Sequence, residues 1–129
     1  MENKGQGQPT VEELQVEVDM KLEMSKLDNM FTDMARELAD EAEWYDSEHC
    51  PSLAELCRYS QRSVHHFIDL FRSECKTLDD VDELLDSFRY DAWNYYKLMQ
   101  SEHFEHLAEL AMARYLTFGE LVTAVERNK

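Results

Sequence analysis

The sequence contains little glycine and little proline, and this scarcity argues against a fold rich in β-strands. In 129 residues there are 3 glycines and 2 prolines. A β-domain of this size needs many tight turns, which commonly contain one of these two residues. Pro9 and Pro51 both stand where a helix would begin or end. We therefore expect an all-α fold.

Positive charge is also scarce. The chain has 13 Lys+Arg against 28 Asp+Glu, which gives a formal net charge of −15. Because binding to nucleic acids and to anionic membranes depends on lysine and arginine, we expect neither direct nucleic-acid binding nor membrane binding. A strongly acidic chain suits a protein partner with a basic surface. The acidic residues gather in the first and last parts of the chain, whereas residues 50–76 are nearly neutral.

The cysteines offer no disulfide framework, and no uncharged run is long enough to span a bilayer. Cys50, Cys57 and Cys75 are odd in number and have no CxxC spacing. This usage is typical of reduced thiols in a reducing compartment. We also expect no signal peptide. Together these absences predict a soluble cytoplasmic protein.

What the sequence does contain is helical periodicity with clear start signals. Thr10 to Glu13 form a capping-box pattern, in which the threonine hydroxyl and the glutamate carboxylate each bond a free backbone amide. Similar patterns begin at Ser52, Thr77 and Thr117. Apolar residues spaced three or four apart follow these signals, as they do on one face of a helix.

We therefore predict a helical bundle of three main helices plus a short C-terminal helix. The bundle is expected to form a single domain at 10–129, preceded by a flexible tail at 1–9. The predicted helices cover residues 11–47, 53–76, 78–116 and 118–127, and a break near residue 101 is one alternative for the third.

One segment has the periodicity of a strand instead. Six apolar residues there alternate with polar ones, namely Leu14, Val16, Val18, Met20, Leu22 and Met24. The chain has no second run of this kind, so a strand here would have to pair with another molecule. The capping box and the content of Glu, Leu, Met and Lys favour a helix. The pattern leaves both interpretations open for residues 14–24.

The third predicted helix has apolar residues on two sides. Placing residues about 100° apart puts Trp93, Phe104 and Tyr115 opposite its main stripe. A helix that is apolar on two sides is normally buried on both. Unbroken, it would be about 60 Å long, which is too long for a monomer with a radius of gyration of about 14 Å. Either this helix breaks near Ser101 or it extends into a dimer or a partner, and of these we favour a homodimer. We expect the three aromatic residues to make intermolecular contacts.

Carboxylates are concentrated along the first predicted helix. The five that we expect to interact with a partner are Asp33, Glu37, Asp40, Glu41 and Asp46. Carboxylates one helical turn apart are separated by about 5–6 Å, close to the spacing of phosphates along a nucleic-acid strand. The residues indicate an inhibitor or adaptor that binds a basic protein surface. In charge and helicity the chain is similar to the small acidic anti-restriction and anti-defence proteins of phages, and this similarity implies a DNA mimic.

A metal-binding bundle is the main alternative. Glu102, His103 and His106 are close in sequence, and histidines three residues apart on a helix can share a metal ion. The periodicity places His106 at the centre of the apolar stripe, where an imidazole needs a partner. A di-iron bundle, however, requires Glu-x-x-His motifs, and this segment has none.

A magnesium-dependent nucleotide hydrolase is the second alternative. Such enzymes hold Mg²⁺ with paired carboxylates on facing helices. The pairs Glu37 with Asp40 and Glu83 with Asp86 come near this pattern, but no basic residue for a phosphate lies close in sequence. There is also no glycine-rich phosphate loop and no GxSxG motif. We therefore expect a binding protein without a cofactor and not an enzyme.

Overall fold

The computed structural model describes residues 7–129, and in this range it contains four long α-helices and no strand. The helices are α2 (Val11–Ser47), α3 (Pro51–Glu74), α4 (Leu78–Ser101) and α5 (Glu105–Arg127). The predicted all-α fold is confirmed, and residues 14–24 are helical. Most of the tail predicted at 1–9 lies outside the described residues.

Two of the predicted capping boxes begin helices. At the start of α2 the Thr10 hydroxyl accepts a hydrogen bond from the backbone N–H of Glu13 at 3.0 Å. The Glu13 carboxylate in turn accepts one from the backbone N–H of Thr10 at 2.8 Å. Thr77 and Asp80 form the same pair at the start of α4. The box predicted at Ser52 does not form, because α3 already begins at Pro51, whose fixed φ suits the first position of a helix.

The short C-terminal helix predicted at 118–127 does not exist as a separate element. Its expected cap, Thr117, lies inside α5, where its hydroxyl donates to the carbonyl of Ala113 at 2.9 Å. Phe118, Leu121 and Val125 are almost fully buried on the same helix. The burial of these side chains outweighs the local preference of threonine for a helix start.

Of the alternatives for residues 78–116, the structure contains the break near Ser101, and the turn there matches the turn between α2 and α3. In each turn a histidine adopts the left-handed conformation, with φ 60 at His49 and φ 63 at His103. The amide of the following residue then donates to a carbonyl five residues back, from Cys50 to Tyr45 and from Phe104 to Met99, both at 2.8 Å. This is the hydrogen bond of a Schellman motif, which ends a helix sharply.

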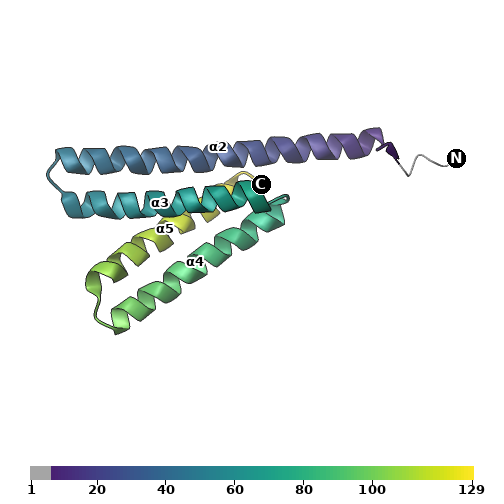
Figure 1. Ribbon diagram of the computed structural model, residues 1–129. Helices are drawn as coiled ribbons and strands as arrows, with labels where there is room; N and C mark the ends of the chain where they lie inside the picture. Colours follow the sequence, from purple (N-terminus) through teal and green to yellow (C-terminus); the bar gives the residue numbers. More distant parts are fainter. Residues whose placement is uncertain (1–6) are drawn as a thin grey trace.

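The four helices form two antiparallel hairpins, α2 with α3 and α4 with α5 (Figure 1). The second hairpin is inclined to the first. The two are closest near the C-terminus and diverge toward their turns. Helices α3 and α5 run in the same direction and pack against each other, whereas α2 and α4 are the outer helices.

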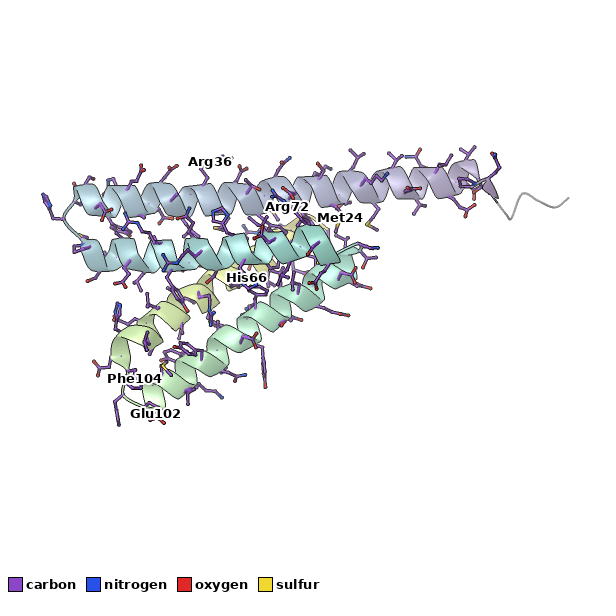
Figure 2. All side chains as sticks on the ribbon, in the orientation of Figure 1. Met24, Arg36, His66, Arg72, Glu102 and Phe104 are labelled. Carbon is purple, nitrogen blue, oxygen red and sulfur yellow. The ribbon has the colours of Figure 1, made fainter. Side chains whose placement is uncertain are left out.

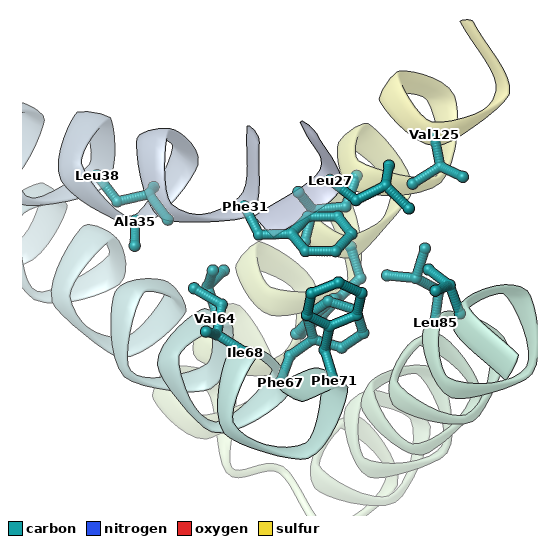
Figure 3. Close-up of a cluster of buried hydrophobic side chains, with 13 residues drawn as sticks. Leu27, Phe31, Ala35, Leu38, Val64, Phe67, Ile68, Phe71, Leu85 and Val125 are labelled. Atoms are coloured by element: carbon teal, nitrogen blue, oxygen red, sulfur yellow. The ribbon is translucent and has the colours of Figure 1, made fainter. Parts of the chain in front are cut away.

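The core lies where the hairpins meet and receives side chains from all four helices (Figure 3). Phe67 is completely buried at its centre, in edge-to-face contact with Phe31 at 4.9 Å and Phe118 at 5.8 Å between ring centroids. Edge-to-face pairs of this kind stabilise a core beyond the area that they bury. The aromatic contacts therefore tie the first hairpin to the second.

The two hairpins are also related in sequence, by an offset of 54 residues that takes Ser47 to Ser101. Seven of the ten residues from Ser47 to Leu56 are identical to those from Ser101 to Leu110. This segment contains both turns and both left-handed histidines. This internal repeat was not among the predictions made from the sequence.

Outside that segment, the relationship is visible in which positions are buried. The same offset connects seven pairs of buried residues, Leu27/Val81, Phe31/Leu85, Leu38/Ala92, Ala54/Ala108, Val64/Phe118, Phe67/Leu121 and Phe71/Val125. Two equivalent aspartates, Asp28 and Asp82, each pair at 2.8 Å with a cation near the end of the hairpin, Arg72 and Lys129 respectively. The protein is therefore a repeated helical hairpin, and residues 11–23 of α2 precede the first repeat.

Candidate interaction surface

The outward side of α2 carries an acidic face, which we define as Asp33, Glu37, Asp40, Glu41 and Trp44. Four of these residues are spaced at i, i+4, i+7 and i+11, which places them on one side of a helix. All five are exposed. The buried residues of α2, including Phe31 and Leu38, lie on the opposite side. The amphipathic pattern that buries one side of α2 thus exposes this acidic face.

The charge of the acidic face is largely unbalanced within the molecule. Asp33 pairs with Arg36 on the same helix at 2.9 Å. Among residues 7–129, no cation forms an ion pair with Glu37, Asp40 or Glu41. The fifth carboxylate predicted for this surface, Asp46, instead turns toward α3 and pairs with Arg58. Three neighbouring carboxylates therefore have no counter-charge in direct contact within the described part of the chain.

Trp44 is the part of this surface that the sequence analysis missed. Its side chain is 59% exposed, and its ring contacts only Tyr45 among the aromatic residues described, at 5.2 Å between centroids. Tryptophan is enriched among the residues that contribute most to protein interfaces. Trp44 follows Asp40 by four residues and Glu37 by seven, and this helical spacing could have placed it on the same face from the sequence.

The aromatic residues predicted to make intermolecular contacts do not form a single surface. Trp93 and Tyr115 lie together, with ring centroids 5.2 Å apart. Arg89 donates to the Tyr115 hydroxyl at 3.2 Å and stacks over its ring at 4.9 Å, so Tyr115 is half-buried. Trp93 is 37% exposed. Phe104 is 54% exposed but lies apart from this pair, at the α4–α5 turn (Figure 2).

The three residues predicted to bind a metal ion are all exposed near that turn. Glu102 ends α4, and His103 occupies the left-handed position. His106 lies on α5, with Nε2 3.1 Å from the Glu55 carboxylate and Nδ1 3.9 Å from that of Glu109. No group of three or more His, Cys, Asp and Glu side chains in residues 7–129 is arranged to hold a metal ion.

The prediction that His106 occupies the centre of an apolar stripe is wrong. That prediction assumed a continuous helix through Ser101. The turn at residues 102–104 starts a new helix with a different orientation, so the residues that follow do not continue the stripe of α4. Ala108 and Ala111 face the interior instead, and His106 is exposed.

The carboxylate pairs considered for magnesium are not brought together. Glu37 and Asp40 lie on α2, whereas Glu83 and Asp86 lie on α4, and α2 and α4 are the two outer helices. Nor are the cysteines suited to nucleophilic chemistry, since burial is the main cause that raises the pKa of the Cys57 and Cys75 thiols.

Comparison with protein-family models, with curated proteins and with solved structures finds no match to this chain. Within residues 7–129, no helix combines the length and the apolar character needed to cross a membrane. The function of this chain is therefore inferred from the surfaces described above.

Proposed function

We propose that this chain is a binding protein that uses the acidic face of α2 to dock on a basic surface of another protein, as an inhibitor or an adaptor in the cytoplasm. The observation that carries this proposal is the combination of three carboxylates that form no ion pair within residues 7–129, Glu37, Asp40 and Glu41, with the exposed ring of Trp44. The net charge of −15 also attracts a basic partner, and this attraction acts over longer distances than the contacts of the acidic face.

The two parts of the acidic face have different physical roles in this proposal. Carboxylates at a solvent-exposed rim accelerate the encounter with a basic partner and select against acidic ones. Each exposed ion pair adds at most about 1 kcal/mol to the affinity of the complex, so the three carboxylates contribute as a set. Trp44 supplies apolar area that becomes buried in the complex, which is the larger source of affinity.

A DNA-binding protein is the partner class that this geometry suits best. The carboxylates of α2 follow one another at about one helical turn, about 5–6 Å. A site built to accept successive phosphates can accept such a row. The complex should then weaken steeply with salt, because screening acts on exposed charges. DNA should also compete with this chain for the same partner.

The proposal can be tested with two triple variants that remove equal charge from equivalent outer helices. E37Q/D40N/E41Q alters the acidic face of α2, and E83Q/D86N/D91N alters exposed residues of α4. Each variant serves as bait for affinity capture from the native host, with mass spectrometry of the proteins retained. We expect the first variant to lose a partner that the second retains. Equal capture by both variants would contradict the proposal.

Self-association is a further part of the proposed function. The homodimer was expected from the apolar side chains of the segment that became α4 and α5. In the structure Trp93 and Tyr115 cover each other in part. The first turns of α2 leave apolar area exposed on the side that continues the core, where Val16 is 65% exposed. We therefore propose a homodimer that forms through the start of α2.

A further inference from the structure

The start of α2 extends beyond the helix that it packs against (Figure 1). The ion pairs Asp28–Arg72 and Asp46–Arg58 fix α2 and α3 as antiparallel, and they place Glu74, the last residue of α3, opposite about residues 26–28 of α2. About 15 residues of α2, or about 23 Å, therefore project past the end of α3. We call residues 11–24 the overhang.

The apolar residues of the overhang form two opposite stripes. Residues two apart on a helix differ by about 200° in direction, so the alternation between residues 14 and 24 divides its members between two sides. The inner stripe contains Val16, Met20 and Met24 and continues the buried stripe that begins at Leu27. The outer stripe contains Leu14, Val18 and Leu22, which point away from the bundle.

The inner stripe forms one wall of an apolar groove of about 850 Å³. The other wall is the end of α3 and the loop after it, where Phe71, Cys75 and Thr77 contribute. Charged residues line the groove as well, and these are Glu13, Glu17, Lys21, Asp28, Arg72 and Lys76. Methionine side chains such as Met20 and Met24 adapt readily to an incoming apolar surface. Figure 2 shows Met24 and Arg72 close to each other at this end of the bundle.

We infer that the overhang of a second copy of this chain fills the groove, antiparallel to the first. This inference rests on the self-association in the proposed function, and it is independent of docking on a basic partner. In the resulting two-fold dimer each overhang packs its inner stripe against that of the other copy. The same residues are buried on both copies, as two-fold symmetry requires.

Continuity with the hairpin is the first reason to choose a second copy. α3 covers the inner side of α2 only as far as residues 26–28, and the groove begins where α3 ends. An antiparallel second overhang would occupy the place of a longer α3. It would therefore continue the antiparallel packing that already exists between α2 and α3.

Charge complementarity is the second reason. In this arrangement the first turn of the second overhang lies beside the end of α3. Glu12 and Glu13 of the second copy then lie near Lys76, which forms no ion pair within residues 7–129, and near Arg72, which already pairs with Asp28. The C-terminal end of α3 also meets the N-terminal end of the second α2, and opposite ends of helix dipoles attract each other.

The area of the interface sets the expected strength of the dimer. The overhang is about 21 Å long and about 10 Å wide, so burying half its circumference covers roughly 330 Å² on each copy. With the wall of the groove that α3 supplies, the two copies bury roughly 1,000 Å² in total, which is the lower limit for a specific interface. We therefore expect a dimer that dissociates on dilution in the micromolar range.

Two valines that lie two residues apart offer a matched test. Val16 lines the groove and is 65% exposed in the single chain, whereas Val18 lies on the outer stripe and is 51% exposed. Glutamate at either position keeps good helix propensity and leaves the core untouched. We expect sedimentation equilibrium to show a dimer for the wild-type chain and for V18E. In V16E a charge would be buried in the interface, so the dimer should weaken at least about tenfold.

Thermal unfolding followed by circular dichroism at low concentration provides the folding control, and all three proteins should unfold alike there. A wild-type chain that stays monomeric at high concentration would overturn both the self-association and this interface. A wild-type dimer that V16E leaves intact, or that V18E dissociates to the same extent, would overturn the interface alone. Neither result bears on the acidic face, which the capture experiment tests separately.

Discussion

Equivalent positions of the two hairpins are buried, but the residues that the hairpins expose to solvent differ. Their buried residues correspond in seven pairs under the 54-residue offset. On the outer helices, Asp33, Glu37, Asp40, Glu41 and Trp44 of α2 correspond to Ser87, Asp91, Asn94, Tyr95 and Leu98 of α4. Packing against the core limits what can stand at a buried position, whereas exposed positions are free of that limit. The acidic face is therefore not a requirement of this fold, which supports a role for it in binding.

The largest effect is expected from removing equivalent core side chains, one from each hairpin. Phe67 and Leu121 occupy equivalent positions and are both 0% exposed. We expect F67A to lower the free energy of unfolding by about 3–5 kcal/mol and L121A by about 2–5 kcal/mol. Urea denaturation of both variants would measure this. A loss below about 1 kcal/mol for L121A would show that the two positions are not equivalent in the core.

A smaller effect is expected on partner binding when equivalent exposed residues are truncated. Trp44 and Leu98 correspond, and they are 59% and 52% exposed. We expect W44A to weaken binding to the captured partner by about 2 kcal/mol, or about 30-fold, as for a central interface residue. L98A should leave the affinity unchanged. Isothermal titration calorimetry would measure the affinity of both variants for the partner. Equal losses of affinity in W44A and L98A would contradict the distinction between the two outer faces.

The smallest effect is expected at the equivalent aspartates. The hydrogen bond from Arg72 lowers the pKa of Asp28. Since the folded-state pKa lies below the unfolded value of about 3.9, the pair stabilises the fold above that pH, and its contribution is lost as pH falls through the folded-state pKa. We expect D28N to cost roughly 0.5 kcal/mol near neutral pH. D82N should cost less, because Lys129 donates one hydrogen bond to Asp82, whereas Arg72 donates two to Asp28.

This last prediction is checked by measuring the stability of wild type and D28N across the acid range. The difference between them should shrink below about pH 4, where Asp28 begins to protonate in the unfolded chain. A difference that grows toward low pH would contradict the assignment of the Asp28–Arg72 pair as stabilising.

Local signals predicted most of the helices. The capping boxes at Thr10 and Thr77 give the starts of α2 and α4, and the spacing of apolar residues gives the extent of α2. Thr117 carries the same local signal and yet lies within α5. The difference is that the residues after Thr117 pack into the core, and sequence spacing does not reveal which threonine is buried.

The candidate surface was less predictable. The carboxylates from Asp33 to Glu41 could be placed on an exposed side by periodicity alone. The orientation of Asp46 toward Arg58 depends on the packing of α3 against α2, which periodicity does not give. The repeat was missed because its identity is concentrated in the segment from Ser47 to Leu56. Elsewhere the hairpins are connected mainly by which positions are buried, with Asp28 and Asp82 as one identical pair, and burial is a property of the folded chain.

The acidic face of α2 can be tested most directly through the two tryptophans of the chain, since Trp44 lies on α2 and Trp93 on α4. Each indole N–H gives one signal in a ¹H–¹⁵N correlation spectrum. When the captured partner is added to labelled protein, we predict that the Trp44 signal shifts or broadens and that the Trp93 signal stays in place. A shift of Trp93 with Trp44 unchanged would contradict the account and would assign binding to the second hairpin.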